Sequence, residues 1–137
     1  MNTIIATIST IKNLQNLNIV ECVTQNETLT MMNLDLKESL KESLKEGSRI
    51  KLAIKPTNIT LAKKLSGELS CENILNAAVT EIDKGKLLCS VTLAYEQHTL
   101  EAIITLNTAE KLALKVGESL NLLISASDIY IQEILDD

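Results

Sequence analysis

The sequence predicts an all-β protein with one short helix per repeat, built as two tandem OB-like, five-stranded β-barrel modules. Apolar residues alternate along several short stretches, as in strands with one buried face. The order of three strands, a helix and two strands is read twice, and it suits a small barrel. The apolar positions of the two halves also correspond at an offset of 71 residues in the first strand, which pairs Ile4 with Leu75, Ala6 with Ala77 and Ile8 with Val79, and at an offset of 70 residues in the last two strands.

The first strand of each repeat breaks phase near its end, at Ile11 and at Ile82, and this shared break predicts a bulge or bend. The remaining elements of the first repeat are expected as an Asn-rich turn 12–18, strand 19–24, loop 25–27, strand 28–33, helix 37–46 and strands over 50–54 and 59–61. In the second repeat they are turn 83–86, strand 87–93, loop 95–98, strand 99–105, helix 108–114 capped by Asn107 or Thr108, and strands over 120–124 and 129–131.

Glycines mark the ends of both predicted helices, at Gly47 and Gly117. The KESL repeat within 37–46 is typical of a solvated helix face. These elements divide the chain into a divergent module 1–62, a linker 63–69 and a module 70–137. A module of this size buries little surface, so we expect the modules, and two or three chains, to associate.

The composition predicts a compact, aliphatic core. The chain has 137 residues, is 45% hydrophobic and contains no Phe or Trp. Residues 1–66 carry nine basic and six acidic side chains, whereas residues 67–137 carry four and twelve. This acidic second half and the lack of aromatic residues disfavour an OB-type nucleic-acid binder. We expect three reduced cysteines, no signal peptide, no membrane insertion and a cytoplasmic location.

Catalytic signals are weak, and we expect no enzyme, no cofactor and no metal site. His98 is expected to be a solvated loop residue, and Cys71 a small structural thiol. There is no glycine-rich phosphate loop and no Cys/His cluster with metal-ligand spacing.

Three short segments are candidates for binding an anion, because hydroxyls and free backbone N–H groups at a turn can hold a tetrahedral oxyanion. We name them the first corner, Lys55-Pro56-Thr57, the second corner, Ser125-Ala126-Ser127, and the lead-in segment, Ser70-Cys71-Glu72-Asn73. Residues of these types also form ordinary turns, and spacing alone favours that reading.

The second repeat resembles the molbindin family, the Mop or TOBE domains that bind molybdate and tungstate. The resemblance rests on the lead-in segment before an apolar strand, on Ala102-Ile103-Ile104-Thr105 before the helix, and on the second corner before Asp128-Ile129. The first repeat is similar to a divergent member, with Asn2, Gly47 and the first corner retained. The resemblance implies a cytoplasmic, oligomeric protein that binds molybdate or tungstate at module or subunit interfaces for storage or homeostasis.

The sequence departs from the family pattern at two charged positions. Glu72 stands where the family has Arg, and Ser125 stands where it has Lys. A Lys about 4 Å from a unit anion contributes roughly 4 kcal/mol at an effective dielectric of about 20, and a Glu opposes binding similarly. We therefore expect the first corner, which keeps Lys55, to pair with Ser70 and Cys71 of another module. The alternative is a ligand-free regulatory module that associates with a molybdate transporter ATPase.

Overall fold

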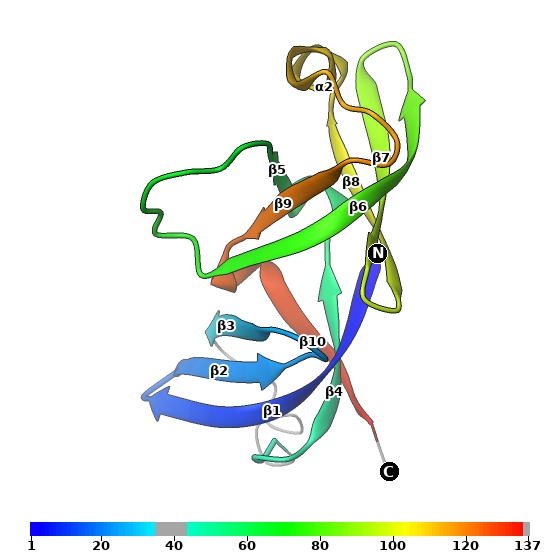
Figure 1. The fold of residues 1–137 in the computed structure, drawn as a ribbon. Helices are drawn as coiled ribbons and strands as arrows, with labels where there is room; N and C mark the ends of the chain where they lie inside the picture. The colour runs from blue at the N-terminus through cyan, green and yellow to red at the C-terminus, as the bar shows by residue number, and fades with distance from the viewer. Residues whose placement is uncertain (35–43, 136–137) are drawn as a thin grey trace.

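The computed structural model describes residues 1–34 and 44–135, which form two five-stranded antiparallel sheets, one above the other in Figure 1. The predicted all-β class with OB-like modules is confirmed. The elements are β1 (Asn2–Leu14), β2 (Leu17–Val23), β3 (Thr28–Leu34), β4 (Arg49–Ile54), η1 (Pro56–Asn58), β5 (Thr60–Ala62), β6 (Asn73–Lys84), β7 (Leu88–Tyr95), β8 (His98–Thr105), α2 (Leu106–Leu112), β9 (Ser119–Ile124), η2 (Ala126–Asp128) and β10 (Ile129–Leu135).

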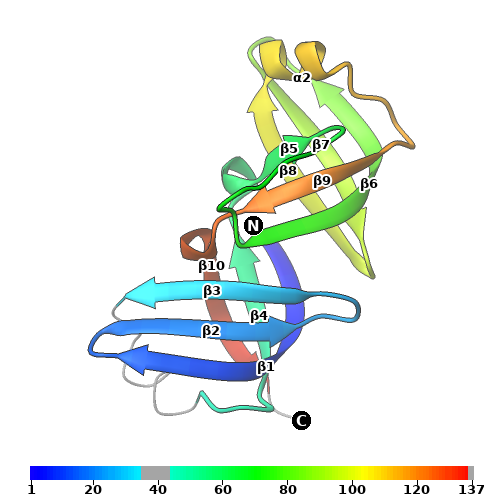
Figure 2. The ribbon, with the colours of Figure 1, turned by 60° about the vertical axis from the view of Figure 1, so that its left-hand side comes forward.

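Each sheet takes one edge strand from the other repeat. The strand order is β10-β4-β1-β2-β3 in the first sheet and β5-β9-β6-β7-β8 in the second. β10, at the end of the chain, pairs with β4, and β5 pairs with β9 (Figure 2). The sheets therefore exchange their last strands across the predicted boundaries at 62 and 70.

The shared phase break of the first strands is a β-bulge in both repeats. The register of β1 against β2 shifts between Ile8 and Thr10, and that of β6 against β7 shifts between Val79 and Glu81. The side-chain hydroxyl of the extra residue in each bulge donates a hydrogen bond to the partner strand. Ser9 Oγ donates to Glu21 O at 3.0 Å, and Thr80 Oγ1 donates to Thr92 O at 3.2 Å. The predicted bend is therefore confirmed.

The helix of the second repeat lies two residues earlier than predicted. Thr105 is its N-cap, and the Thr105 hydroxyl accepts from the Thr108 N–H at 3.2 Å. This hydroxyl satisfies an otherwise unpaired helix donor, so capping by Asn107 or Thr108 is wrong. The helix ends at Leu112, because Ala113 adopts a left-handed conformation. The helix predicted over 37–46 lies outside the described residues up to 43, and 44–46 are not helical.

Gly47 and Gly117 hold equivalent places beside the two bulges. Both have positive φ, 89° and 96°, which side-chain-bearing residues rarely adopt. The Gly47 N–H donates to Ile8 O, and the Gly117 N–H donates to Val79 O, each at 2.8 Å. The glycines thus close the same turn onto the first strand of each repeat.

Two predicted turns are shorter than expected. The Asn-rich turn 12–18 is wrong, because β1 continues to Leu14 and β2 begins at Leu17, with Gln15 in a left-handed conformation. Leu87 was expected to begin the strand 87–93, but it precedes β7 and is 82% exposed. Local alternation does not reveal that two residues suffice for the turn after β1 and three for the turn after β6.

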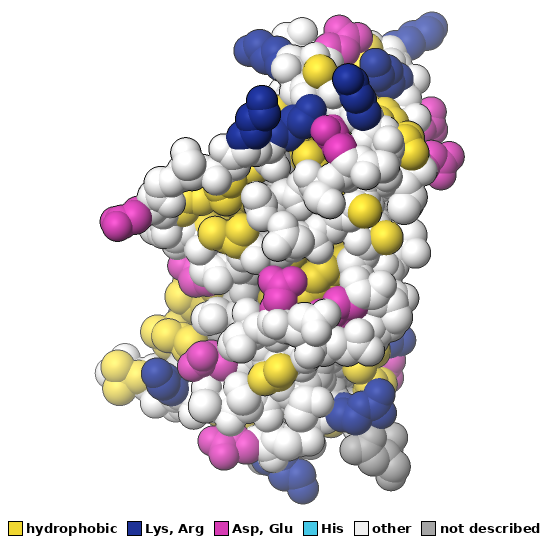
Figure 3. Space-filling view, viewed as in Figure 1, with side chains coloured by type: hydrophobic (Ala, Val, Ile, Leu, Met, Phe, Trp, Pro, Cys, Tyr) yellow, Lys and Arg dark blue, Asp and Glu magenta, His cyan; other side chains and the backbone are white. Residues whose placement is uncertain are grey.

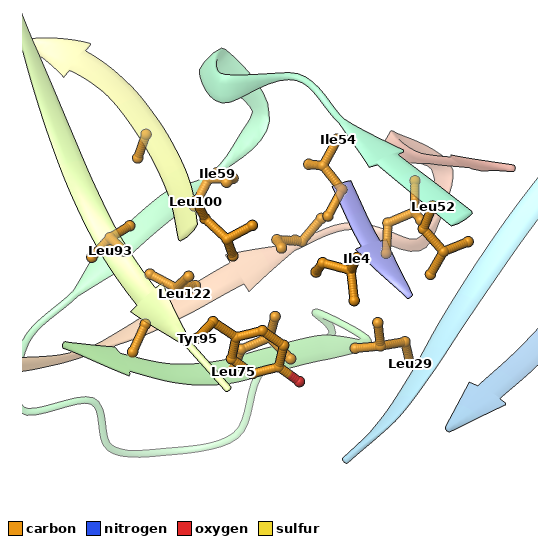
Figure 4. Close-up of a cluster of buried hydrophobic side chains, with 14 of the residues drawn as sticks. Ile4, Leu29, Leu52, Ile54, Ile59, Leu75, Leu93, Tyr95, Leu100 and Leu122 are labelled. Carbon is orange, nitrogen blue, oxygen red and sulfur yellow. The ribbon is translucent and has the colours of Figure 1, made fainter. Parts of the chain in front are cut away.

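The buried side chains of both sheets form one continuous, mainly aliphatic core. Figure 4 shows Ile4, Leu29 and Leu52 of the first repeat near Leu75, Leu100 and Leu122 of the second. The core also contains Tyr95, which is 1% exposed, so the expectation of a purely aliphatic core is wrong at this position. The continuity of the core explains how modules this small are stable.

Candidate functional site

The two corners have the same backbone geometry. Lys55 and Ser125 are extended, and a 3-10 turn follows each. Asn58 N–H donates to Lys55 O, and Asp128 N–H donates to Ser125 O, both at 2.9 Å. The first turn, η1, packs against β8 of the other repeat, and the second, η2, packs against β3. Both corners therefore lie where the two repeats meet.

The corners differ in the donor that the middle residue offers. Pro56 has no backbone N–H, so the first corner lacks a donor at this position. Ala126 has one, but it donates to Glu72 Oε1 at 3.0 Å. The first corner thus offers the Lys55 ammonium and the Thr57 hydroxyl, whereas the second offers the two hydroxyls of Ser125 and Ser127.

The lead-in segment contains residues with different surroundings. Ser70 and Glu72 are exposed, and Cys71 is half-buried, with its thiol 3.4 Å from Asn73 O. Within one chain, Glu72 therefore hydrogen-bonds to the second corner, and Cys71 hydrogen-bonds to the start of its own strand, β6. Among the described residues, Lys55 makes no hydrogen bond or ion pair with the lead-in segment, so the predicted pairing of Lys55 with Ser70 and Cys71 would require a second chain.

Asn73 is a clamp between the repeats. Its side-chain oxygen accepts from Thr30 N–H at 2.7 Å, and its amide donates to Thr30 O at 2.9 Å and to Ile124 O at 3.0 Å. The residue is 1% exposed. Both amide N–H bonds are thus used within the chain, and a direct ligand contact by the predicted residue Asn73 would have to break one of them.

Asn2 makes the matching clamp at the other repeat. Its side chain donates to Glu101 O and accepts from Glu101 N–H, both at 2.8 Å. Asn2 and Asn73 stand 71 residues apart, as do Thr30 and Glu101. The two clamps give the chain an approximate two-fold symmetry, and each ties the first strand of one repeat to an edge strand of the other.

A polar cluster at the sheet junction was missed from the sequence. Thr24 Oγ1 lies 3.1 Å from the Tyr95 hydroxyl and donates to Glu96 Oε2 at 2.8 Å. The N–H groups of Gln25 and Asn26 also donate to Glu96, at 3.1 and 3.0 Å. Tyr95 and Glu96 were assigned to a loop because their neighbours are polar. In the structure they contact the turn between β2 and β3, which is about 70 residues away in the sequence.

The carboxyl groups of this cluster have shifted pKa values. Burial raises the pKa of Glu27, and the neighbouring Glu96 charge adds to the effect. Burial also opposes ionisation of Glu96, but the hydrogen bonds from Thr24, Gln25 and Asn26 outweigh it and lower the pKa of Glu96. Burial raises the pKa of the Tyr95 hydroxyl, which therefore stays protonated and can donate.

His98 is a structural residue, and its predicted place as a solvated loop residue is wrong. It begins β8 and is half-buried. Nε2 accepts from the Ile5 N–H at 3.1 Å, and the ring stacks on Tyr95 with centroids 6.4 Å apart. The Nε2 atom of this imidazole is therefore already used as a hydrogen-bond acceptor within the fold.

A pocket of about 270 Å³ lies beside the first corner, between β5, β8 and α2. Four threonines and five aliphatic residues line it: Thr57, Thr60, Thr105, Thr108, Ile59, Leu61, Ile103, Ile104 and Leu112. No charged side chain lines it, so the pocket alone does not supply the charge that an oxyanion needs. Within the part of the chain that the structure describes, no group of three His, Cys, Asp or Glu side chains can hold a metal ion. The described residues also contain no helix long and apolar enough to cross a membrane.

The structure therefore defines a protein of two OB-like modules that exchange their last strands and present paired corners at their junction. Residues 69–131 match the TOBE domain family. No curated protein sequence matches the chain.

A solved structure extends the similarity to nearly the whole chain. The cytoplasmic molybdate-binding protein ModG, in a crystal form with molybdate bound, is similar over 94% of this chain and 93% of its own, with 25% identity and a TM-score of 0.85. A molybdate-binding protein from Sporomusa ovata is similar over 49% of this chain and 100% of its own, with 28% identity and a TM-score of 0.47. The resemblance to the molbindin family is thus confirmed by the TOBE match and by the two-module fold shared with ModG.

Proposed function

We propose that this protein binds molybdate or tungstate without catalysis, at interfaces between modules or subunits, and that it serves intracellular storage or homeostasis. The observation that carries this proposal is the similarity to ModG across nearly the full length of both chains. That similarity spans 94% of this chain and 93% of ModG, so it extends over both repeats. A cytoplasmic location follows from the same relationship.

The candidate ligand-binding residues are those of the first corner, the lead-in segment and the second corner. Lys55, Thr57 and Ser70 are exposed, so they are available to a second chain. Exposed apolar side chains lie near two of these segments: Leu69, 47% exposed, and Ile74, 37% exposed, flank the lead-in segment, and Tyr130, 40% exposed, follows the second corner by three residues. Such residues support a subunit contact at this place, which would bring Lys55 of one chain to Ser70 and Cys71 of another in a dimer or trimer.

The surface charge is consistent with a site built between chains. On the face drawn in Figure 3, Lys and Arg side chains gather at the α2 end and at the opposite end, while acidic side chains are scattered over the whole face, including the middle. The second corner, Ser125-Ala126-Ser127, contains no Lys or Arg, so Lys55 of a neighbouring chain would supply positive charge there.

The proposal is tested by thermal unfolding with and without oxyanion. Molybdate or tungstate should raise the melting temperature in a concentration-dependent way, and sulfate at the same concentration should not, because only a ligand that prefers the native state stabilises it. Isothermal titration with tungstate gives affinity and sites per chain, and light scattering gives the number of chains. Equal shifts with all three anions would contradict selective oxyanion binding.

One observation favours a second function, a ligand-free regulatory module that acts through a molybdate transporter ATPase. The Glu72 carboxylate occupies the Ala126 N–H, a donor that an oxyanion would use. If neither molybdate nor tungstate changes the melting temperature while the chain binds such an ATPase in a pull-down with purified components, this second function is the correct one.

A further inference from the structure

We propose that Glu72 is the residue that closes the second corner to oxyanions, because its carboxylate already holds the N–H that the ligand would need. The Glu72 carboxylate would then take the place of a bound anion at this corner. Molybdate or tungstate could bind there only if the Glu72 side chain moved away from the Ala126 N–H. This inference rests on the proposed oxyanion-binding function and concerns which of its sites is open.

The contact is well placed to act in this way. Glu72 Oε1 accepts from the Ala126 N–H at 3.0 Å, and Ala126 is 3% exposed. The bond from Asp128 N–H to Ser125 O fixes the corner, so the direction of the Ala126 N–H is set. A carboxylate and a tetrahedral oxyanion are both acceptors, and one N–H in this geometry serves one of them at a time.

The first corner shows that the turn does not need this hydrogen bond. It forms the same 3-10 turn, with Asn58 N–H on Lys55 O at 2.9 Å. At the positions equivalent to Ala126 and Glu72, however, the first repeat has Pro56 and Met1, which provide neither the donor nor the carboxylate. Because the turn folds without the pair, the contact between Glu72 and Ala126 is not a requirement of the fold.

Charge adds to the exclusion. Glu72 is exposed and places a negative charge beside the hydroxyls of Ser125 and Ser127, and Asp128 adds a second acidic group to the same turn. A dianion approaching this corner meets like charges and a donor that is already in use. The chain uses the same device at the sheet junction, where the Glu96 carboxylate fills the turn formed by Gln25 and Asn26.

The test compares tungstate titrations of the wild-type chain with those of Glu72→Ala, Glu72→Gln and a matched control, Glu68→Ala. Glu68 lies four positions upstream of Glu72 and is exposed. Its substitution by Ala removes the same charge from the chain but leaves the hydrogen bond to the Ala126 N–H intact. Glu72→Ala should bind tungstate about tenfold more tightly or gain one site per chain, because a hydrogen bond to a charged acceptor is freed. Glu72→Gln removes the charge but keeps an acceptor, so its gain should be smaller. Glu68→Ala should bind as the wild type does.

A second readout locates the effect. In ¹⁵N-labelled protein, the Ala126 amide resonance should move on addition of tungstate in Glu72→Ala and stay in place in the wild type. Wild-type binding that is unchanged in Glu72→Ala, or an equal gain in Glu68→Ala, would overturn the role of Glu72 and leave the proposed function standing. If folded wild type and folded Glu72→Ala both fail to bind, the proposed function and this inference are both wrong.

Discussion

Thr24 and Tyr95 occupy equivalent positions in the two repeats, 71 residues apart, and their hydroxyl oxygens face each other at 3.1 Å where the sheets meet. A residue that contacts its own equivalent lies close to the axis that relates the two copies. The two repeats therefore meet at this pair, with the asparagine clamps on either side, and the polar cluster marks the centre of the junction.

Removing the Tyr95 hydroxyl should weaken this junction. We expect Tyr95→Phe to lower the free energy of unfolding by about 1–2 kcal/mol, because the hydroxyl is buried and leaves Thr24 with one partner fewer. Urea unfolding measures the change. Tyr130→Phe is the control, since Tyr130 is 40% exposed and its substitution should stay within about 0.5 kcal/mol. Equal effects of the two substitutions would contradict the central role of Tyr95.

Asn73 should be the more important of the two asparagine clamps. Asn73→Ala leaves Thr30 N–H and both carbonyls without their partner, and we expect a loss of about 2–4 kcal/mol in unfolding free energy. Asn2→Ala should cost less, because Asn2 makes two such bonds instead of three. Asn76 lies on the same strand but is exposed, so Asn76→Ala should change the unfolding free energy little. A small effect of Asn73→Ala would show that the clamp does not hold the repeats together.

The two glutamates of the junction should give opposite pH dependences of stability. The pKa of Glu27 is raised in the folded state. Its contribution to the free energy of unfolding is therefore greatest at low pH and is lost as the pH rises through the pKa of the folded state. The pKa of Glu96 is lowered, so its contribution is present above the ordinary value and is lost as the pH falls through the folded one. At pH 7, Glu27→Gln should raise the melting temperature and Glu96→Gln should lower it. Both differences should shrink in thermal scans at acidic pH.

The three thiols should differ in reactivity. Burial raises the pKa of Cys22 to about 12 and also raises the pKa of Cys89, so few thiolates form at these positions at neutral pH. Cys71 is half-buried and lies beside an exposed segment. Iodoacetamide should therefore label Cys71 first in the native protein, and mass spectrometry should find Cys22 and Cys89 modified only after unfolding. Early labelling of Cys22 would contradict its buried position.

Lys55 should supply positive charge to the oxyanion. We expect Lys55→Ala to weaken tungstate binding about tenfold or more, because a nearby ammonium stabilises a bound anion. Lys64→Ala is the control, since Lys64 is also exposed. This substitution removes one positive charge as well, but from the linker. Isothermal titration measures both variants. Unchanged affinity in Lys55→Ala would rule out the pairing of the first corner with Ser70 and Cys71 of another chain.

The sequence predicts the parts of this fold that depend on local order. The alternation of Ile4, Ala6 and Ile8, and the phase break after them, are local properties of a strand, and both are found in the structure. The corners were also placed correctly, because an extended residue followed by a short turn leaves a signal in turn-forming residues. Periodicity indicates which face of a strand is buried. It does not indicate which sheet the strand joins.

The parts that could not be predicted depend on contacts between distant segments. Nothing in Ile129–Leu135 distinguishes pairing with β9 from pairing with β4, since both neighbours are equally apolar. The partner of Glu72 is likewise 54 residues away, at Ala126. Tyr95 was read as polar loop because its local neighbours are polar, although its surroundings in space are the aliphatic core.

The exchange of β5 and β10 also changes what the covalent link between the repeats does. A cut within 63–69 would leave two fragments, and each would still hold the last strand of the other in its sheet. The peptide bond there would serve mainly to keep the local concentration of the two halves high. In this sense the chain is an interlocked pair of subunits that happen to share one backbone, and separating them requires unfolding both.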